Sequence, residues 1–155
     1  MKSKPSFMDL LDLPAMTICT STRQALPHAA SVYFVADDHL SLYFLSAPAS
    51  QHARDLAENP LAAVTIAPLA ERWQEIRGLQ MRGQVAEIPN GFQSLAGWAR
   101  YLAKFPYVEN FEIEVLKNRF YAFKPDWIRL VDNRVRFGYK QEWSGPDLMK
   151  LCESR

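Results

Sequence analysis

The sequence predicts a mainly β domain with helices, in the form of an antiparallel barrel of about six to seven strands with helices packed over its openings. Short runs rich in β-branched and aromatic residues recur along the chain, and turn residues such as Pro, Asn, Asp and Gly separate them. Residues 73–88 alternate between apolar and polar positions, which is typical of a half-buried antiparallel strand. Helical spacing is confined to short segments between these runs.

Turn residues set the order of the expected strands. We expect strands at residues 15–22, 27–36, 40–47, 61–67, 73–88, 119–131 and 134–140. The turn Asp37-Asp38-His39 joins the second and third strands into a hairpin, and Asp132-Asn133 suits the turn of a final hairpin. Pro125 lies inside the sixth run and cannot donate a hydrogen bond to a neighbouring strand, so it predicts an edge position or a bulge.

Four segments are expected to be helical. They are an N-terminal helix within residues 1–13, a helix over residues 51–58, and helices within residues 92–105 and 108–118. Ser50 is a favourable N-cap for the second of these, and Asn59-Pro60 ends it. We expect residues 144–155 to form a tail and residues 1–155 to form a single domain, because a chain of 155 residues can bury a core of its own.

The composition is that of an ordinary globular protein. Hydrophobic residues make up 48% of the chain, and Lys+Arg number 18 against 17 Asp+Glu, so no broad positive field predicts a nucleic-acid partner. No apolar run approaches the roughly 20 residues of a membrane span, and no signal-peptide core follows the basic start. The prediction is a cytoplasmic protein with free thiols at Cys19 and Cys152. Three histidines far apart in sequence predict no metal site.

The segment from Leu42 to Leu56 is the strongest candidate for a binding site. It joins a strand to a helix N-terminus, where unpaired N–H groups and a partial positive charge favour a phosphate. Ser50 could donate its hydroxyl, His52 a ring N–H, and Arg54 could help if its side chain curls back. The alternative interpretation is that Ser50 is an ordinary helix cap and His52 a solvated surface residue.

Several runs, in their order, resemble the pyridoxamine 5'-phosphate oxidase-like split-barrel proteins, which bind FMN. The runs are Pro27-His28-Ala29-Ala30-Ser31-Val32-Tyr33-Phe34, Leu42-Tyr43-Phe44-Leu45-Ser46, Ser50-Gln51-His52-Ala53-Arg54-Asp55-Leu56-Ala57-Glu58-Asn59-Pro60, Ile76-Arg77-Gly78-Leu79-Gln80-Met81-Arg82-Gly83-Gln84-Val85 and Phe137-Gly138-Tyr139-Lys140-Gln141-Glu142-Trp143. The resemblance spans roughly residues 15–143 and rests on the order and spacing of these runs. It implies a split barrel that forms a homodimer, with the flavin at the subunit interface.

The resemblance also implies a set of cofactor contacts. In the family, the strand matching His28, Ala30, Ser31 and Val32 presents its backbone to the isoalloxazine ring. The strand end matching Leu45 and Ser46 lines the ribityl chain. The residues matching Ser50, Gln51 and His52 bind the phosphate. The partner chain supplies residues from the long strand and the C-terminal hairpin, for which Arg77 and Trp143 are the candidates here.

Departures from the family pattern narrow the expected activity. Gln51-His52 stands where Arg-Lys is usual, so permanent cations are missing from the phosphate site. Gly78 replaces a glutamine of the true oxidase, and no arginine segment follows Trp143, so oxidation of pyridoxamine phosphate itself is not expected. The resulting hypotheses are a flavin-dependent oxidoreductase that acts on a small molecule or electron donor, a flavin or haem carrier or sensor, and a dimerisation domain with an empty groove. A deazaflavin is an alternative to FMN, and no side chain is assigned a catalytic role.

Overall fold

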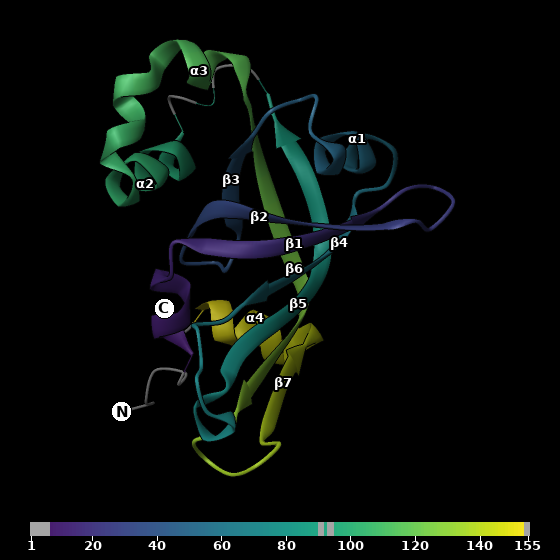
Figure 1. Ribbon diagram of the computed structural model, residues 1–155, viewed down its shortest axis with the longest axis vertical. Coiled ribbons are helices and arrows are strands. Elements are labelled where there is room, and N and C mark those ends of the chain that lie inside the picture. The colour runs from purple at the N-terminus through teal and green to yellow at the C-terminus, as the bar shows by residue number, and fades with distance from the viewer. Residues whose placement is uncertain (1–6, 90–91, 93–94, 154–155) are drawn as a thin grey trace.

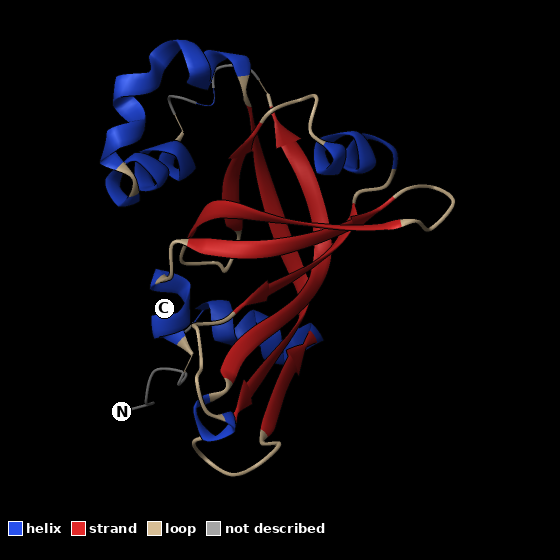
Figure 2. Ribbon diagram, viewed as in Figure 1, coloured by secondary structure: helices blue, strands red, loops and turns tan. Residues whose placement is uncertain are grey.

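A seven-stranded antiparallel sheet dominates the computed structural model, which describes residues 7–89, 92 and 95–153 (Figures 1 and 2). Its strands are β1 (Ala15–Ser21), β2 (Pro27–Ala36), β3 (Leu42–Ser46), β4 (Leu61–Ile66), β5 (Arg77–Ile88), β6 (Arg119–Asp132) and β7 (Lys140–Ser144). The α-helices are α1 (Gln51–Glu58), α2 (Ala96–Lys104), α3 (Glu112–Lys117) and α4 (Gly145–Glu153). The described residues also form the 3-10 helices η1 (Met8–Asp12), η2 (Trp73–Glu75) and η4 (Pro106–Phe111).

Six of the strands close into a barrel. The strand order is β3-β2-β1-β4-β5-β6-β7, and β3 also pairs with the first part of β6, which joins the two ends of the sheet. The second part of β6 leaves β3 and pairs with β7 instead, so β7 extends the sheet beyond the closed barrel. The predicted mainly β fold with an antiparallel barrel and helices is therefore confirmed.

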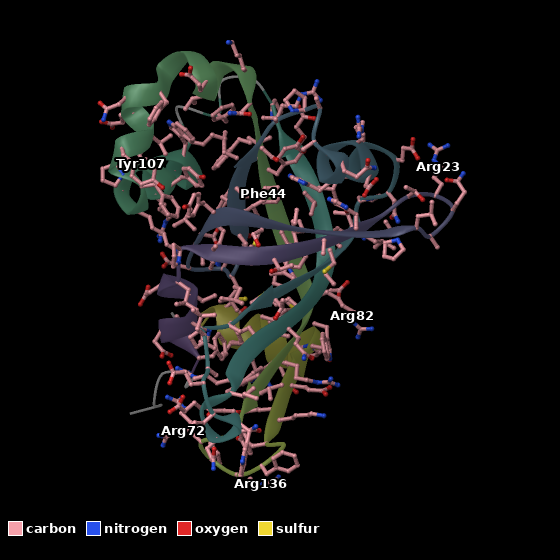
Figure 3. All side chains as sticks on the ribbon, viewed as in Figure 1. Arg23, Phe44, Arg72, Arg82, Tyr107 and Arg136 are labelled. Carbon is pink, nitrogen blue, oxygen red and sulfur yellow. The ribbon has the colours of Figure 1, made fainter. Side chains whose placement is uncertain are left out.

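Alternation along β5 determines which side chains enter the barrel. Leu79, Met81 and Val85 are buried, whereas Gln80 and Arg82 are exposed on the outer face. Figure 3 shows the same division, with Phe44 inside the barrel and Arg82 on its outer surface. The pattern is that of a strand with one face on a core, as the sequence predicts.

Pro125 lies at a bulge, where it pairs only with β5. On the other side of β6 the pairing with β3 ends at Phe123 and the pairing with β7 begins at Trp127, so the predicted edge position or bulge is confirmed. The register shifts opposite it, so that Arg82 pairs with Trp127 but Gly83 pairs with Pro125. A Cβ atom at Gly83 would lie 2.0 Å from the carbonyl oxygen of Lys124. The close approach of the two backbones therefore requires glycine at this position.

We expect Gly83→Ala to lower the free energy of unfolding by about 2–3 kcal/mol, because the β5 and β6 backbones must separate to admit the methyl group. Urea unfolding followed by tryptophan fluorescence measures the change. Gln84→Ala, at the exposed neighbouring position, is the control and should stay within about 0.5 kcal/mol of the parent chain. Equal unfolding midpoints for the two variants would contradict this account of the bulge.

The C-terminal part of the chain differs from its prediction in two places. Residues 134–139, expected as part of a strand, form the loop between β6 and β7, because Asp132 and Asn133 side chains accept backbone N–H groups from Arg134 and Gly138. The expected tail at residues 144–155 contains helix α4, whose Leu148 and Leu151 are buried in the barrel core. The predicted hairpin is present, with its second strand beginning at Lys140.

The expected helices are present: α1 has the predicted bounds, α2 lies within the segment expected at residues 92–105, and η4 and α3 cover most of the segment expected at residues 108–118. The helix expected within residues 1–13 is the 3-10 helix η1, and residues 1–6 lie outside the described residues. The expected strand start at residues 73–76 contains η2, and β5 begins at Arg77. Helices α2 and α3 cover one end of the barrel, and α1 lies beside another part of the same end (Figure 1).

A second, smaller core lies between α2 and the outer face of β2, β3 and β6. It consists of Val35, Phe92, Trp98, Tyr101, Phe105, Val115 and Phe120. Tyr43 and Leu45 pack against it from β3, while Phe44 points the other way into the main core. Alternate side chains of β3 thus pack into the two different cores. Packing between aromatic rings explains the aromatic residues of the second core without a ligand.

Candidate functional site

Helix α1 begins where the sequence predicts, directly after β3 and a short turn. Ser50 has the extended backbone of an N-cap, and its Oγ accepts the backbone N–H of Ala53 at 3.3 Å. The helix ends at Asn59, and its buried face includes Ala53 and Leu56. The first N–H groups of a helix have no acceptor within it, so this end presents donors to a ligand.

Three polar side chains meet at this helix end. His52 Nε2 forms a hydrogen bond with Ser46 Oγ and lies 3.2 Å from Ser50 Oγ. The two serine hydroxyls are 3.4 Å apart. His52 is only 8% exposed and Ser46 only 9%. The interpretation of His52 as a solvated surface residue is therefore wrong, and these residues form what we call the Ser46–Ser50–His52 cluster.

A second set of hydrogen bonds fixes α1 on the barrel. Thr20 of β1 donates its hydroxyl to Asp55 at 2.8 Å, and Gln51 donates its side-chain amide to the same carboxylate at 2.8 Å. Arg54 bonds Gln51 at 2.9 Å on the exposed helix surface instead of curling toward the cluster. Gln51 and Arg54 thus support the helix, and their side chains are engaged away from the cluster.

The protonation of His52 and Asp55 depends on burial, on hydrogen bonds and on neighbouring titratable groups. Burial lowers the pKa of His52, and the nearby His28 lowers it further, while Asp55 acts in the opposite sense. Burial alone would raise the pKa of Asp55, but hydrogen bonds from Gln51 and Thr20 outweigh burial and lower it. At neutral pH the site therefore combines an ionised Asp55 with a mainly neutral His52.

The chemistry of these donors fits a phosphate. The cluster supplies two hydroxyls and one imidazole beside the free N–H groups at the start of α1, and none of its three side chains is a permanent cation. Such an arrangement binds an anion through oriented dipoles and the partial positive charge of the helix end. It can orient a phosphate group.

The predicted residues on β2 and β3 lie on different faces. Ala30 and Val32 face the main core, and Ser31 is exposed on the outer surface of β2. His28 pairs with Thr20 across β1 and β2, which places it on the side of the sheet that faces α1. Leu45 packs on the second core, away from the neighbouring Ser46. The structure thus brings together His28, Ser46, Ser50 and His52.

Arg77 and Trp143 lie elsewhere within this chain. Arg77 is buried at the start of β5, where it pairs with Asp9 and with Asp132, whose Oδ2 lies 3.6 Å from Arg77 Nε. Trp143 packs edge-on against Phe7, with ring centroids 5.2 Å apart. The start of β5 and strand β7 lie at the end of the barrel away from α1 (Figure 1). A role for either residue in the same site would need a second chain.

Sequence reasoning missed Thr20 and Asp55, which anchor the site. Asp55 stands four residues after Gln51, a spacing that brings the two side chains together on a helix surface. That spacing was the available signal for the Gln51 contact. Thr20 comes from a strand 35 positions away, and only the fold reveals that its hydroxyl reaches Asp55.

Metal ligation and membrane crossing by a helix have no support in the described part of the chain. No group of three or more His, Cys, Asp or Glu residues there could hold a metal ion. Within the same residues, no helix combines the length and apolar character needed to cross a membrane.

Comparisons with known proteins place the chain in a defined group. The family model described as Pyridoxamine 5'-phosphate oxidase matches residues 7–132. A UPF0306 protein from Photorhabdus laumondii is 28% identical over 128 residues, which cover 83% of this chain and 85% of the relative. The crystal structure of HutZ, called the heme storage protein from Vibrio cholerae, has a TM-score of 0.69 with 15% identity, over 81% of this chain and 91% of HutZ. A heme binding protein from Mycobacterium smegmatis has a TM-score of 0.74 with 17% identity, over 96% of this chain and 62% of that one.

Proposed function

The chain belongs to the pyridoxamine 5'-phosphate oxidase family, and from this we propose that it binds FMN, with the phosphate held by the Ser46–Ser50–His52 cluster. The observation that carries the proposal is the convergence of two hydroxyls and a buried imidazole on the N-terminus of α1. This helix end occupies the position that the family resemblance assigns to the phosphate. The donor set fits that group without a change of fold.

The protein's part in the proposed activity is to position the cofactor. A bound flavin would supply hydride or electron transfer, and the protein would supply binding, orientation and electrostatics. Ser46, Ser50 and the first N–H groups of α1 would hold the phosphate, and the β2 backbone from His28 to Val32 would lie along the ring. The chain would act as an oxidoreductase on a small molecule or electron donor, and a deazaflavin with the same phosphate would satisfy the same cluster.

We extend the proposal to a homodimer with the flavin at the interface. The outer face formed by β1, β4 and β5 carries small side chains such as Cys19 and Ala63, and it contains an open hollow of about 560 Å³ beside Arg82. Leu61 on the same face is 56% exposed. A second copy would bury this surface and could bring its own Arg77 or Trp143 toward the cofactor. Analytical ultracentrifugation should give twice the chain mass; a monomer at micromolar concentration would contradict the dimer.

Haem binding is the second candidate, and the fold of HutZ favours it. The likeness to HutZ is at the level of the fold, and the two hydroxyls beside His52 are donors that suit a phosphate, whereas haem iron requires only one axial ligand such as a histidine. In this alternative the protein would carry or sense haem. A Soret band in the purified protein, or after addition of haemin, would identify this function.

One experiment separates these functions. The absorption spectrum of the purified protein is recorded with and without added FMN, and FMN fluorescence is followed during titration. We expect a flavin spectrum, quenched fluorescence and a higher melting temperature in the presence of FMN. Riboflavin, which lacks the phosphate, is the matched ligand and should bind more weakly. Absence of both cofactor absorbance and any ligand-dependent rise in melting temperature would reject FMN binding and leave a structural dimerisation domain.

A further inference from the structure

The position of His52 Nε2 between two serine hydroxyls links the protonation of the ring to the direction of the hydrogen bonds around it. An unprotonated Nε2 is an acceptor, so a neighbouring hydroxyl donates its hydrogen bond to the ring and not to a ligand. A protonated Nε2 is a donor to Ser46 Oγ, and the Ser46 hydrogen can then turn toward a ligand. Ser50 Oγ accepts the N–H of Ala53 and lies 3.2 Å from the same Nε2, so its hydrogen is likewise not needed by a protonated ring.

Few charges surround this ring in the described structure. His28 approaches from β2 and Asp55 from the next turn of α1, and both act on His52 electrostatically. Thr20 of β1 and Gln51 of α1 direct their hydrogen bonds to Asp55, and Arg54 is engaged with Gln51. Ser46 of β3 completes the surroundings. A bound phosphate would therefore be the strongest negative charge in direct reach of His52.

We propose that His52 takes up a proton when the phosphate of the cofactor binds, so that affinity for FMN rises as pH falls. This inference rests on the proposed function. The buried ring stays mainly neutral in the empty site, because a charged imidazole there lacks a counterion in hydrogen-bond contact. The phosphate supplies a negative charge close to the ring, and the protonated ring donates to Ser46 Oγ, so the hydroxyl hydrogen that the neutral ring had accepted becomes available to the anion. A histidine thus replaces the permanent cation that family members place at this position.

The proton should be visible in binding thermodynamics. FMN is titrated calorimetrically into the purified protein at pH 7.5 in two buffers of different ionisation enthalpy. The difference between the two observed binding enthalpies, divided by the difference between the two ionisation enthalpies, gives the number of protons taken up. At this pH the phosphate is already close to its dianionic form, because its second pKa is about 6, so uptake reports on the protein. Over pH 7–8.5 we expect the dissociation constant to increase by up to about tenfold per pH unit.

His52→Gln is the test variant, because the amide keeps a hydrogen-bonding group near the position of Nε2 but cannot take up a proton. It should bind FMN with no proton uptake and with a nearly flat pH profile over the same range. His39→Gln changes an exposed histidine in the β2–β3 turn and should behave as the parent chain. Binding of riboflavin, which lacks the phosphate, should cause no proton uptake that depends on His52.

The outcomes separate this inference from the proposed function. FMN binding without proton uptake, or uptake that persists in His52→Gln, overturns the inference and leaves FMN binding intact. A parent chain that does not bind FMN overturns the proposed function and the inference with it. Proton uptake that disappears in His52→Gln but not in His39→Gln supports the inference.

Discussion

Replacing Asp132 with asparagine is expected to lower the free energy of unfolding by about 2–3 kcal/mol, because the hydrogen bonds from Arg134 lose their charged acceptor and Arg77 loses one of its two carboxylate partners. Asp132 is only 2% exposed and lies beside the buried guanidinium of Arg77 at the start of β5. Its carboxylate also accepts two hydrogen bonds from the Arg134 side chain, at 2.7 and 2.9 Å. The amide would leave Arg77 with Asp9, whose side chain is 64% exposed and well hydrated.

The same substitution should change the response to acid. Hydrogen bonds from Arg134 lower the pKa of Asp132 below its ordinary value of 3.8, against the effect of burial. Because the folded state holds this carboxyl ionised, its stabilising effect is present above pH 4 and is lost as pH falls through the lowered pKa. Urea unfolding at pH 7 and at pH 3 should therefore show a smaller loss of stability in the variant than in the parent chain.

Glu142→Gln is the matched control for Asp132→Asn. Glu142 also pairs with an arginine, Arg129, at 2.7 Å, but its side chain is 47% exposed. Exposed ion pairs contribute about 0–1 kcal/mol, so this variant should unfold close to the parent chain at pH 7. If the two substitutions cost the same, burial of the Arg77–Asp132 pair does not determine stability at this end of the barrel.

Removing both hydroxyls of the cluster, by Ser46→Ala with Ser50→Ala, should weaken FMN binding by about a hundredfold or more. Hydrogen bonds to a charged group contribute about 1.5–3 kcal/mol each, and two would be lost. The loss should be confined to the phosphate, so the affinity for riboflavin should change little. Fluorescence titration with both ligands measures the difference.

The double substitution also removes a helix cap, which itself costs about 1 kcal/mol of stability. Unfolding curves of the double variant therefore accompany the titrations, which are made well below its melting temperature. Ser41→Ala removes a buried hydroxyl outside the cluster and should bind FMN as the parent chain does. Equal losses of affinity for FMN and riboflavin would show that the hydroxyls support the fold of the site and do not hold the phosphate.

Much of the barrel could be predicted from local sequence patterns. The alternation of β5 and the N-cap at Ser50 depend on neighbours a few residues away, and both are present in the structure. The loop at residues 134–139 resembled a strand because basic and apolar residues alternate there. The hydrogen bonds of Asp132 and Asn133 to that loop override the alternation. Helix α4 was missed because its apolar face is short and follows Gly145-Pro146.

The candidate site was predictable in composition but not in geometry. The sequence indicates Ser50 and His52 as phosphate donors, and the structure places them together with Ser46. That His52 would be buried against Ser46, six positions earlier, depends on the angle at which α1 leaves β3. The burial of Arg77 against Asp132 depends on the β5–β6 register, which no local pattern specifies. FMN, the dimer and the contributions of Arg77 and Trp143 from a partner stay predictions.

Helix α4 has a consequence for how the barrel folds. Leu148 and Leu151 belong to the same core as Phe7, Met16 and Ile18, although more than 120 positions separate the two groups in the sequence. Domains fold as units, so a chain in which α4 is not yet available would have an unfinished core. This core therefore stays partly uncovered until α4 packs into it, and contacts this distant in sequence are slow to form.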